Sequence, residues 1–196
     1  MQDSENNKTR KKAAKVEPIT DLKDIQTIKK LLKDKPRDYC LFVLGINTNL
    51  RASDLRRIKV GQVESATEGT ELVLNEQKTK KERRITLNRA ACEAIHTLLA
   101  ASDLQSEDDL FTSQRGTLTV QSIHRLVKSW CREINLKGNY GSHTLRKTFG
   151  YHQRVQLNTS IAELMVMFNH STQKQTLDYL CIQPSEIEEA YLKLCL

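Results

Sequence analysis

Glycine and proline are scarce in this chain, which has only 7 Gly and 3 Pro among its 196 residues. Together they make up about 5% of the sequence, whereas roughly 12% is usual for globular proteins. Because these residues interrupt helices and mark turns, their scarcity favours long helices over a sandwich of many short strands. The length is that of a single domain, and the hydrophobic share of 38% is enough for a packed core.

Most of the chain places apolar residues at three- and four-residue steps, which is the period of an amphipathic helix. Residues that start helices precede several of these stretches: Thr20-Asp21 and Asn88 as N-caps, Pro36 in a first turn, and Ser160 with Glu163 as a capping box. Further helices are predicted over residues 119–134, 143–157 and 172–182, a short one after Ser53, and a last one after Pro184.

The apolar period changes to two in only one region. Leu72–Leu74 form one strand-like run, and Ile85 and Leu87 alternate in a second. The charged stretch 75–84 between them is typical of a hairpin loop. We therefore predict a mainly α-helical domain with one small antiparallel β-sheet, an α+β fold.

The composition excludes several classes of protein. The longest apolar run, Cys40–Ile46, is far shorter than the ~20 residues of a membrane helix, and no apolar stretch follows the polar start. The five cysteines include no CxxC pair, which favours buried thiols in a reducing cytoplasm over disulfides or a zinc site. The histidines show no paired ligand spacing. We expect a cytoplasmic protein with no membrane contact, no bound metal and no cofactor.

Four separated segments hold polar residues that suggest chemistry, and each has a plain structural alternative. Arg51 follows an apolar helix and could be a surface charge, and the bases between residues 78 and 84 could belong to a solvated loop. Ser142, a good N-cap, places His143 and Arg146 on one helix face, where the charges could be incidental.

The fourth segment runs from the break at Asn169-His170 to Tyr179. A tyrosine between Leu177 and Leu180 is most often part of a core. Together, however, the ordered set Arg, Lys, His-x-x-Arg, His, Tyr resembles the catalytic domain of the tyrosine recombinase (phage integrase) family over about residues 20–185. The nine-residue step from His170 to Tyr179 matches the family pattern, as does the three-residue step within the His-x-x-Arg motif.

The resemblance assigns a catalytic role to each of these positions. It makes Tyr179 the nucleophile, Arg51 and Arg146 the pair that clamps the scissile phosphate, and Lys78 the general acid for the leaving 5′-oxygen. A guanidinium fork suits this clamp because it holds two phosphate oxygens at once and never loses its charge. A phosphotyrosine ester would store the energy of the broken bond, so the resemblance implies no nucleotide cofactor.

Supporting roles follow from the same resemblance. His143 would assist proton transfer at the tyrosine hydroxyl, and His170 would hydrogen-bond the phosphate. Asp54 matches an acidic position that buttresses the active site. The other hairpin bases would contact the backbone of double-stranded DNA, and they are Lys80, Lys81, Arg83 and Arg84.

The sequence departs from the family pattern at two turns. The family often has Gly before the Leu-Arg pair and before the second His, where this chain has Asn49 and Asn169. Since Asn tolerates the left-handed backbone better than other non-Gly residues, we predict a positive φ at both positions.

The expected organisation has three parts: a flexible basic arm at 1–19, a catalytic domain at 20–183 and a C-terminal helical tail at 184–196. Family members usually carry an N-terminal core-binding domain, and we expect none here. The tail's apolar stripe would dock on a second copy assembled on DNA or fold back onto its own domain. The expected activity is site-specific recombination or integration. The alternatives are type IB topoisomerase-like nicking and closing, and DNA binding with a relic site.

Overall fold

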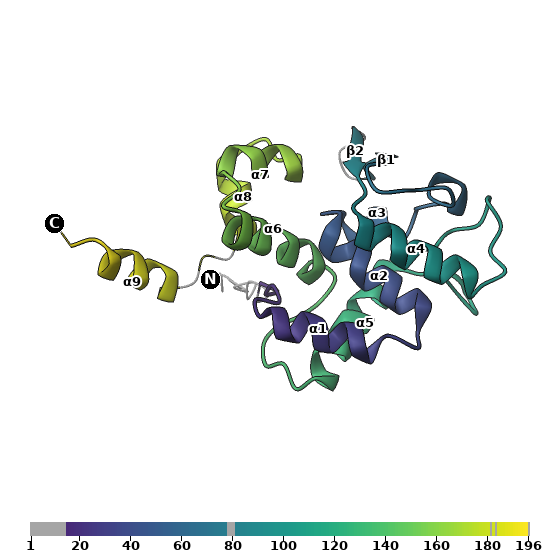
Figure 1. The fold of residues 1–196 in the computed structure, drawn as a ribbon, viewed down its shortest axis with the longest axis horizontal. Coiled ribbons are helices and arrows are strands. Elements are labelled where there is room, and N and C mark those ends of the chain that lie inside the picture. The colour runs from purple at the N-terminus through teal and green to yellow at the C-terminus, as the bar shows by residue number, and fades with distance from the viewer. Residues whose placement is uncertain (1–14, 78–80, 181, 183, 196) are drawn as a thin grey trace, which may run out of the picture.

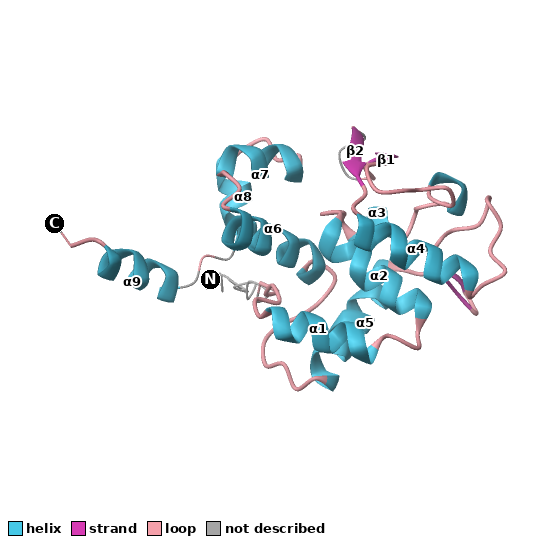
Figure 2. Ribbon diagram, in the orientation of Figure 1, coloured by secondary structure: helices cyan, strands magenta, loops and turns pink. Residues whose placement is uncertain are grey.

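The computed structural model describes residues 15–77, 81–180, 182 and 184–195. Its α-helices are α1 (Leu22–Leu31), α2 (Pro36–Asn47), α3 (Ala52–Leu55), α4 (Arg89–Ala100), α5 (Val120–Glu133), α6 (Thr144–Leu157), α7 (Ile161–Phe168), α8 (Gln173–Leu180) and α9 (Pro184–Lys193). A 3-10 turn spans Val60–Gln62. Figure 2 shows that helices make up most of the described part, as predicted.

Most of these helices begin where the sequence predicts, because their first turns are capped locally. The side chain of Asp21 accepts a hydrogen bond from the Lys23 N–H, and that of Asn88 accepts one from Ala91. Ser160 and Glu163 form the predicted capping box at the start of α7. The predicted helix starts at these points are therefore confirmed.

The helix α6 begins one residue later than predicted, and Ser142 does not cap it. His143 occupies the N-cap position with an α-like backbone and makes no side-chain capping bond. The hydroxyl of Thr144 instead accepts a hydrogen bond from the Gly141 N–H, which closes a turn before the helix. That turn, rather than a serine cap, sets the direction in which His143 leaves the helix end.

In the part of the chain that the structure describes, the strands form two small antiparallel pairs rather than one. The hairpin of β1 (Glu71–Asn75) and β2 (Glu82–Thr86) pairs Leu72 with Ile85, and both side chains are buried. The second pair, β3 (Thr112–Ser113) with β4 (Gly116–Thr117), has strands of two residues, too short for a detectable period of two. Because β2 begins at Glu82, it includes two arginines that the sequence placed in the loop.

The core is built around α2, which packs against α4 and α6. Its residues from Cys40 to Gly45 are all buried. Gly45 permits the approach of α6, since a Cβ there would lie 2.4 Å from the Leu145 side chain. A second, smaller cluster of Leu164, Phe168 and Leu180 joins α7 to α8.

The segment before α1 is packed against the domain from residue 17 onward. The Glu17 N–H donates to the Asn139 carbonyl, and the Ile19 N–H donates to the hydroxyl of Thr148. Ile19 is only 1% exposed. Residues 17–19 therefore belong to the folded domain rather than to the predicted arm, whose residues 1–14 lie outside the described part of the chain.

The helix α9 projects away from the rest of the molecule, beyond α6 and α8 (Figure 1). Ile187, Tyr191, Leu192 and Leu194 are all at least half exposed. An ion pair of 2.6 Å between Arg154 and Glu186 ties its first turn to α6. The tail thus does not cover its own domain in this structure. Within the described ranges, no helix is long and apolar enough to cross a membrane.

Candidate active site

A pocket of about 610 Å³ gathers side chains from the separated segments that the sequence singled out. Its wall includes Arg51, Lys81, His143, His170 and Tyr179. Arg51, Lys81 and His143 directly precede α3, β2 and α6, respectively. His170 lies in the turn between α7 and α8, and Tyr179 lies on α8. The predicted general acid Lys78 and its neighbour Lys80 lie outside the described residues.

Tyr179 lies against the pocket with its hydroxyl directed at a histidine. Its Oη is 3.2 Å from Nδ1 of His143. Its ring lies next to the rings of Phe168 and His170, with centroids 5.4 Å and 5.1 Å away. The tyrosine is therefore held by aromatic packing on one side, and its reactive atom faces an imidazole nitrogen that accepts a proton when His143 carries its hydrogen on Nε2.

His170 is oriented by its neighbours. Its ring stacks on Phe168 with centroids 5.0 Å apart, and Nδ1 lies 3.0 Å from the hydroxyl of the fully buried Thr176. Burial, together with the charges of three nearby arginines, lowers the pKa of His170 to about 4. The imidazole is thus neutral at pH 7, and a Thr176 hydroxyl that donates to Nδ1 leaves the other ring nitrogen as an N–H donor.

Arg51 reaches the pocket from the N-terminus of α3, and a buried carboxylate forms an ion pair with its guanidinium. Its Nη1 lies 2.8 Å from Oε1 of Glu76, which is fully buried at the end of β1. The predicted buttress Asp54 is 4.0 Å from the same nitrogen. The nearer partner of the arginine is therefore Glu76.

Asp54 makes its clearest contact with the hairpin. Its Oδ1 accepts a hydrogen bond of 3.0 Å from the backbone N–H of Gln77. Gln77 immediately precedes Lys78 in the sequence. The carboxylate thus ties the helix that follows Arg51 to the start of the loop that carries the predicted general acid.

Arg146 lies beneath the pocket and is not part of its wall. It is fully buried, and its two terminal nitrogens donate to the carbonyls of Asn49 and Phe168, each at 2.7 Å. Burial, and then the charges of Arg83 and Arg51, lower the pKa of Arg146 to about 9. Its guanidinium lies 5.5 Å from the Tyr179 ring centroid, so it adds positive charge next to the tyrosine without facing the open space.

The two turns with asparagine adopt the predicted left-handed backbone. φ is +56° at Asn49 and +52° at Asn169, which confirms the prediction at both positions. Both side chains also make contacts that glycine could not. The Asn49 amide donates to the Met167 carbonyl, and the Asn169 amide donates to Glu76. The turn before Arg51 is therefore tied to the end of α7, and the turn before His170 is tied to the residue that follows β1.

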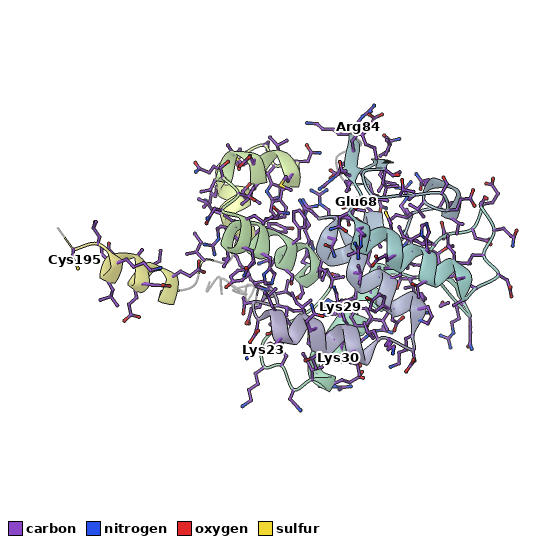
Figure 3. All side chains as sticks on the ribbon, viewed as in Figure 1. Lys23, Lys29, Lys30, Glu68, Arg84 and Cys195 are labelled. Carbon is purple, nitrogen blue, oxygen red and sulfur yellow. The ribbon has the colours of Figure 1, made fainter. Side chains whose placement is uncertain are left out.

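The hairpin arginines differ from each other in role. Arg83, predicted to contact DNA, is only 7% exposed: its Nη1 lies 2.8 Å from Glu76, and its Nη2 donates to the Met167 carbonyl. That prediction is corrected, because the side chain points into the domain. Arg84 lies on the opposite face of β2 and points outward with Glu71 and Glu82 as partners (Figure 3). Lys81 is exposed at the pocket wall.

Sequence reasoning missed two residues that orient this site, Glu76 and Thr176. Glu76 belongs to a run of charged residues that is typical of a solvated loop, and nothing in its local pattern marks it as buried. Thr176 stands three residues before Tyr179 on α8, so its position on the inner face is recognisable only once the helix is placed against Phe168.

Comparison with known proteins gives a consistent result. The family model described as the Phage integrase family matches residues 19–186. The chain is similar to a probable integrase/recombinase, YoeC of Bacillus subtilis (strain 168), with 36% identity over 90% of this chain and 95% of that protein. It is 31% identical to the tyrosine recombinase XerC of Caldanaerobacter subterraneus subsp. tengcongensis, of which it spans about half (49%).

Solved structures agree on the fold. The XerA recombinase matches 94% of this chain with a TM-score of 0.76 and 17% identity, over 65% of its own length. The XerH site-specific recombinase matches 93% of this chain with a TM-score of 0.75 and 16% identity, over 54% of its length. The family match over most of the chain, together with the similarity to YoeC, establishes that this chain belongs to the phage integrase family, the tyrosine recombinases.

Proposed function

We propose that this chain cleaves and rejoins DNA strands as a site-specific recombinase or integrase, with Tyr179 as the nucleophile. The observation that carries the proposal is the position of its hydroxyl, 3.2 Å from Nδ1 of His143, in a pocket whose wall also holds Arg51 and His170. A nucleophile, a proton acceptor and a phosphate-binding cation thus share one open space of about 610 Å³.

The proposed step is a displacement at phosphorus. Oη of Tyr179 forms a bond to the scissile phosphate while its proton passes to His143, and the bond to the 5′-oxygen breaks. Lys78, which the family resemblance assigns as general acid, would protonate that oxygen. The products are a 3′-phosphotyrosine ester and a free 5′-hydroxyl, and attack by a 5′-hydroxyl of a partner strand reverses the chemistry and rejoins DNA.

The charges of the site suit this reaction. Phosphoryl transfer gathers negative charge on the non-bridging oxygens, and donors fixed in advance stabilise it without reorganisation. Arg51 places a positive charge at the pocket wall, and Arg146 adds positive charge from beneath it. Neutral His170 can donate a hydrogen bond without adding another positive charge next to the arginines.

Double-stranded DNA is the proposed substrate, and assembly on it the proposed context. YoeC and XerC carry the names of recombinases, and one solved structure of XerH holds its difH substrate after cleavage. The exposed apolar side chains of α9 support docking of the tail on a second copy rather than on its own domain. The free thiols of Cys40, Cys92 and Cys131 are buried, which suits a cytoplasmic setting.

The test is covalent capture on nicked DNA. A pool of nicked duplexes of randomised sequence would be incubated with the chain and resolved by denaturing electrophoresis, so that only a phosphotyrosine bond keeps DNA on the protein. We expect a covalent band that Tyr179→Phe abolishes. The matched control Tyr39→Phe, at a partly buried tyrosine of α2 that does not line the pocket, should retain it.

The outcomes separate the alternatives. A covalent band that survives Tyr179→Phe would show that another residue is the nucleophile. Relaxation of a supercoiled plasmid without joining of two sites would indicate type IB topoisomerase-like activity. Binding of the duplexes with no covalent band in the unmodified chain would indicate a DNA-binding module with a relic site.

A further inference from the structure

Glu76 is an unusual residue for its place in the sequence. It stands in a charged stretch directly after β1, yet it is 0% exposed. A buried carboxylate is costly unless cations and hydrogen-bond donors surround it. A carboxylate buried beside a pocket that needs positive charge must therefore have cationic partners.

The partners of Glu76 come from three separate parts of the active site. Its Oε1 lies 2.8 Å from Nη1 of Arg51 and 2.8 Å from Nη1 of Arg83. Its Oε2 accepts from the side-chain amide of Asn169, which precedes His170, and its backbone N–H donates to the Lys81 carbonyl. One carboxylate therefore links the start of α3, both strands of the hairpin and the α7–α8 turn.

The charges explain why an acid is required at this point. Arg83 and Arg146 both have a lowered pKa, with burial as the first cause and neighbouring arginines as a further one. The guanidinium groups of Arg51, Arg83 and Arg146 repel one another and would separate in the absence of a counter-charge. Glu76 supplies that counter-charge from the side of Arg51 away from solvent, so Arg51 stays at the pocket wall before any phosphate arrives.

We propose that Glu76 is a positioning residue for the reaction: its carboxylate fixes the guanidinium of Arg51 in the orientation that receives the scissile phosphate. The proposal rests on the proposed function, since it assigns Arg51 the phosphate contact made there. Glu76 adds to the buttress role that the family resemblance assigns to Asp54: its carboxylate lies 2.8 Å from Nη1 of Arg51, against 4.0 Å for Asp54, which also accepts from the hairpin backbone.

The first measurement reads Arg51 directly and needs no DNA. In the DNA-free chain, side-chain NMR of the arginines should show slow rotation of the Arg51 guanidinium, with separate signals for its two terminal nitrogens. In Glu76→Gln, which keeps the size but removes the charge, these signals should merge. The control Glu82→Gln, at an exposed glutamate of the same hairpin, should leave them separate. Merged signals already in the unmodified chain would overturn the proposal.

The second measurement follows covalent capture under single-turnover conditions. Glu76→Gln should lower the rate about 10- to 100-fold, with DNA affinity changed less than about 3-fold and Glu82→Gln unchanged, while Glu76→Asp should restore part of the rate. In an Arg51→Ala background, Glu76→Gln should cause little further loss. An equal loss in both backgrounds would assign Glu76 a general structural role and overturn the proposal.

The two measurements separate the two hypotheses. If the unmodified chain captures no DNA while Glu76→Gln still merges the Arg51 signals, the proposed function fails and the orienting contact stands. If capture occurs normally but Glu76→Gln neither merges the signals nor slows the reaction, the proposed function stands and the role of Glu76 fails.

Discussion

The phenol oxygen of Tyr179 and Nδ1 of His143 lie 3.2 Å apart, although the two residues are 36 positions apart in the chain. Two separate structural features bring these atoms together. The turn closed by Thr144 directs His143 away from the N-terminus of α6, and the Leu164, Phe168 and Leu180 cluster holds α8 beside it. The reactive pair therefore depends on how α8 packs on α6.

Replacement of His143 should impair chemistry more than binding. We expect His143→Gln to slow covalent capture by about 10²- to 10⁴-fold at pH 7, because the Tyr179 hydroxyl must lose its proton as it attacks and His143 is the group placed to accept it. The deficit should shrink as the pH is raised, because hydroxide in solution can then take the proton in place of His143. The control His96→Gln, on the exposed face of α4, should be neutral. A deficit that stays constant with pH would contradict proton transfer to His143.

Protonation of His170 should destabilise the fold in mild acid. Its pKa is lowered to about 4 by burial and by the nearby arginines, so between pH 6.5 and pH 4 the unfolded chain binds a proton that the folded chain does not. Stability from this group is thus fully present above pH 6.5 and falls as the pH drops. Since the ring is partly exposed, we expect a loss of about 1–2 kcal/mol.

Urea unfolding measured from pH 7 to pH 4 would test this expectation. His152 also has a lowered pKa, so the comparison that matters is the unmodified chain against His170→Asn. The variant should lose less stability over this range. Parallel curves would show that His170 does not carry the effect.

The two adjacent hairpin arginines should respond differently to replacement. Arg83→Ala leaves Glu76 with one fewer buried counter-charge and removes a bond to the Met167 carbonyl, so we expect a loss of about 3–5 kcal/mol in unfolding free energy. Arg84→Ala, on the solvent face of the same strand, should leave the urea midpoint unchanged. Equal effects would contradict the assigned burial of Arg83.

DNA affinity should fall steeply with salt. Each phosphate neutralised by a basic side chain contributes about 0.9 to the slope of log K against log salt concentration. Lys81 is exposed at the pocket wall, so Lys81→Ala should lower that slope by about 1 and weaken binding to all sequences alike. Titrations at several salt concentrations would measure both. A slope that Lys81→Ala leaves unchanged would exclude a phosphate contact by this lysine.

The sequence predicts the helices and the main hairpin well because their signals are local. Asn88 and Ser160 act within three residues, and the inward positions of Leu72 and Ile85 follow from alternation alone. The start of α6 was misplaced because Ser142 has the composition of a cap, while the turn that prevails depends on the hydroxyl of Thr144.

The residues that line the pocket can be predicted from the sequence, but the buried residues that hold them in place are harder to predict. The order and spacing of the polar segments identify Arg51, His143, His170 and Tyr179, and the structure brings all four to one pocket. Burial of Glu76 depends instead on three segments that converge from distant parts of the chain. The period of two along β2 does place Arg83 on the inner face, but only after the strand is known to begin at Glu82.

The left-handed turns at Asn49 and Asn169 have a consequence for comparing this chain with relatives that carry glycine there. Exchange of either asparagine for glycine would keep the backbone shape and remove one amide cross-link, to the Met167 carbonyl or to Glu76. Two sequences can therefore share the same path of main chain here and still differ in how rigidly neighbouring loops are coupled. An overlay of backbones alone would miss that difference.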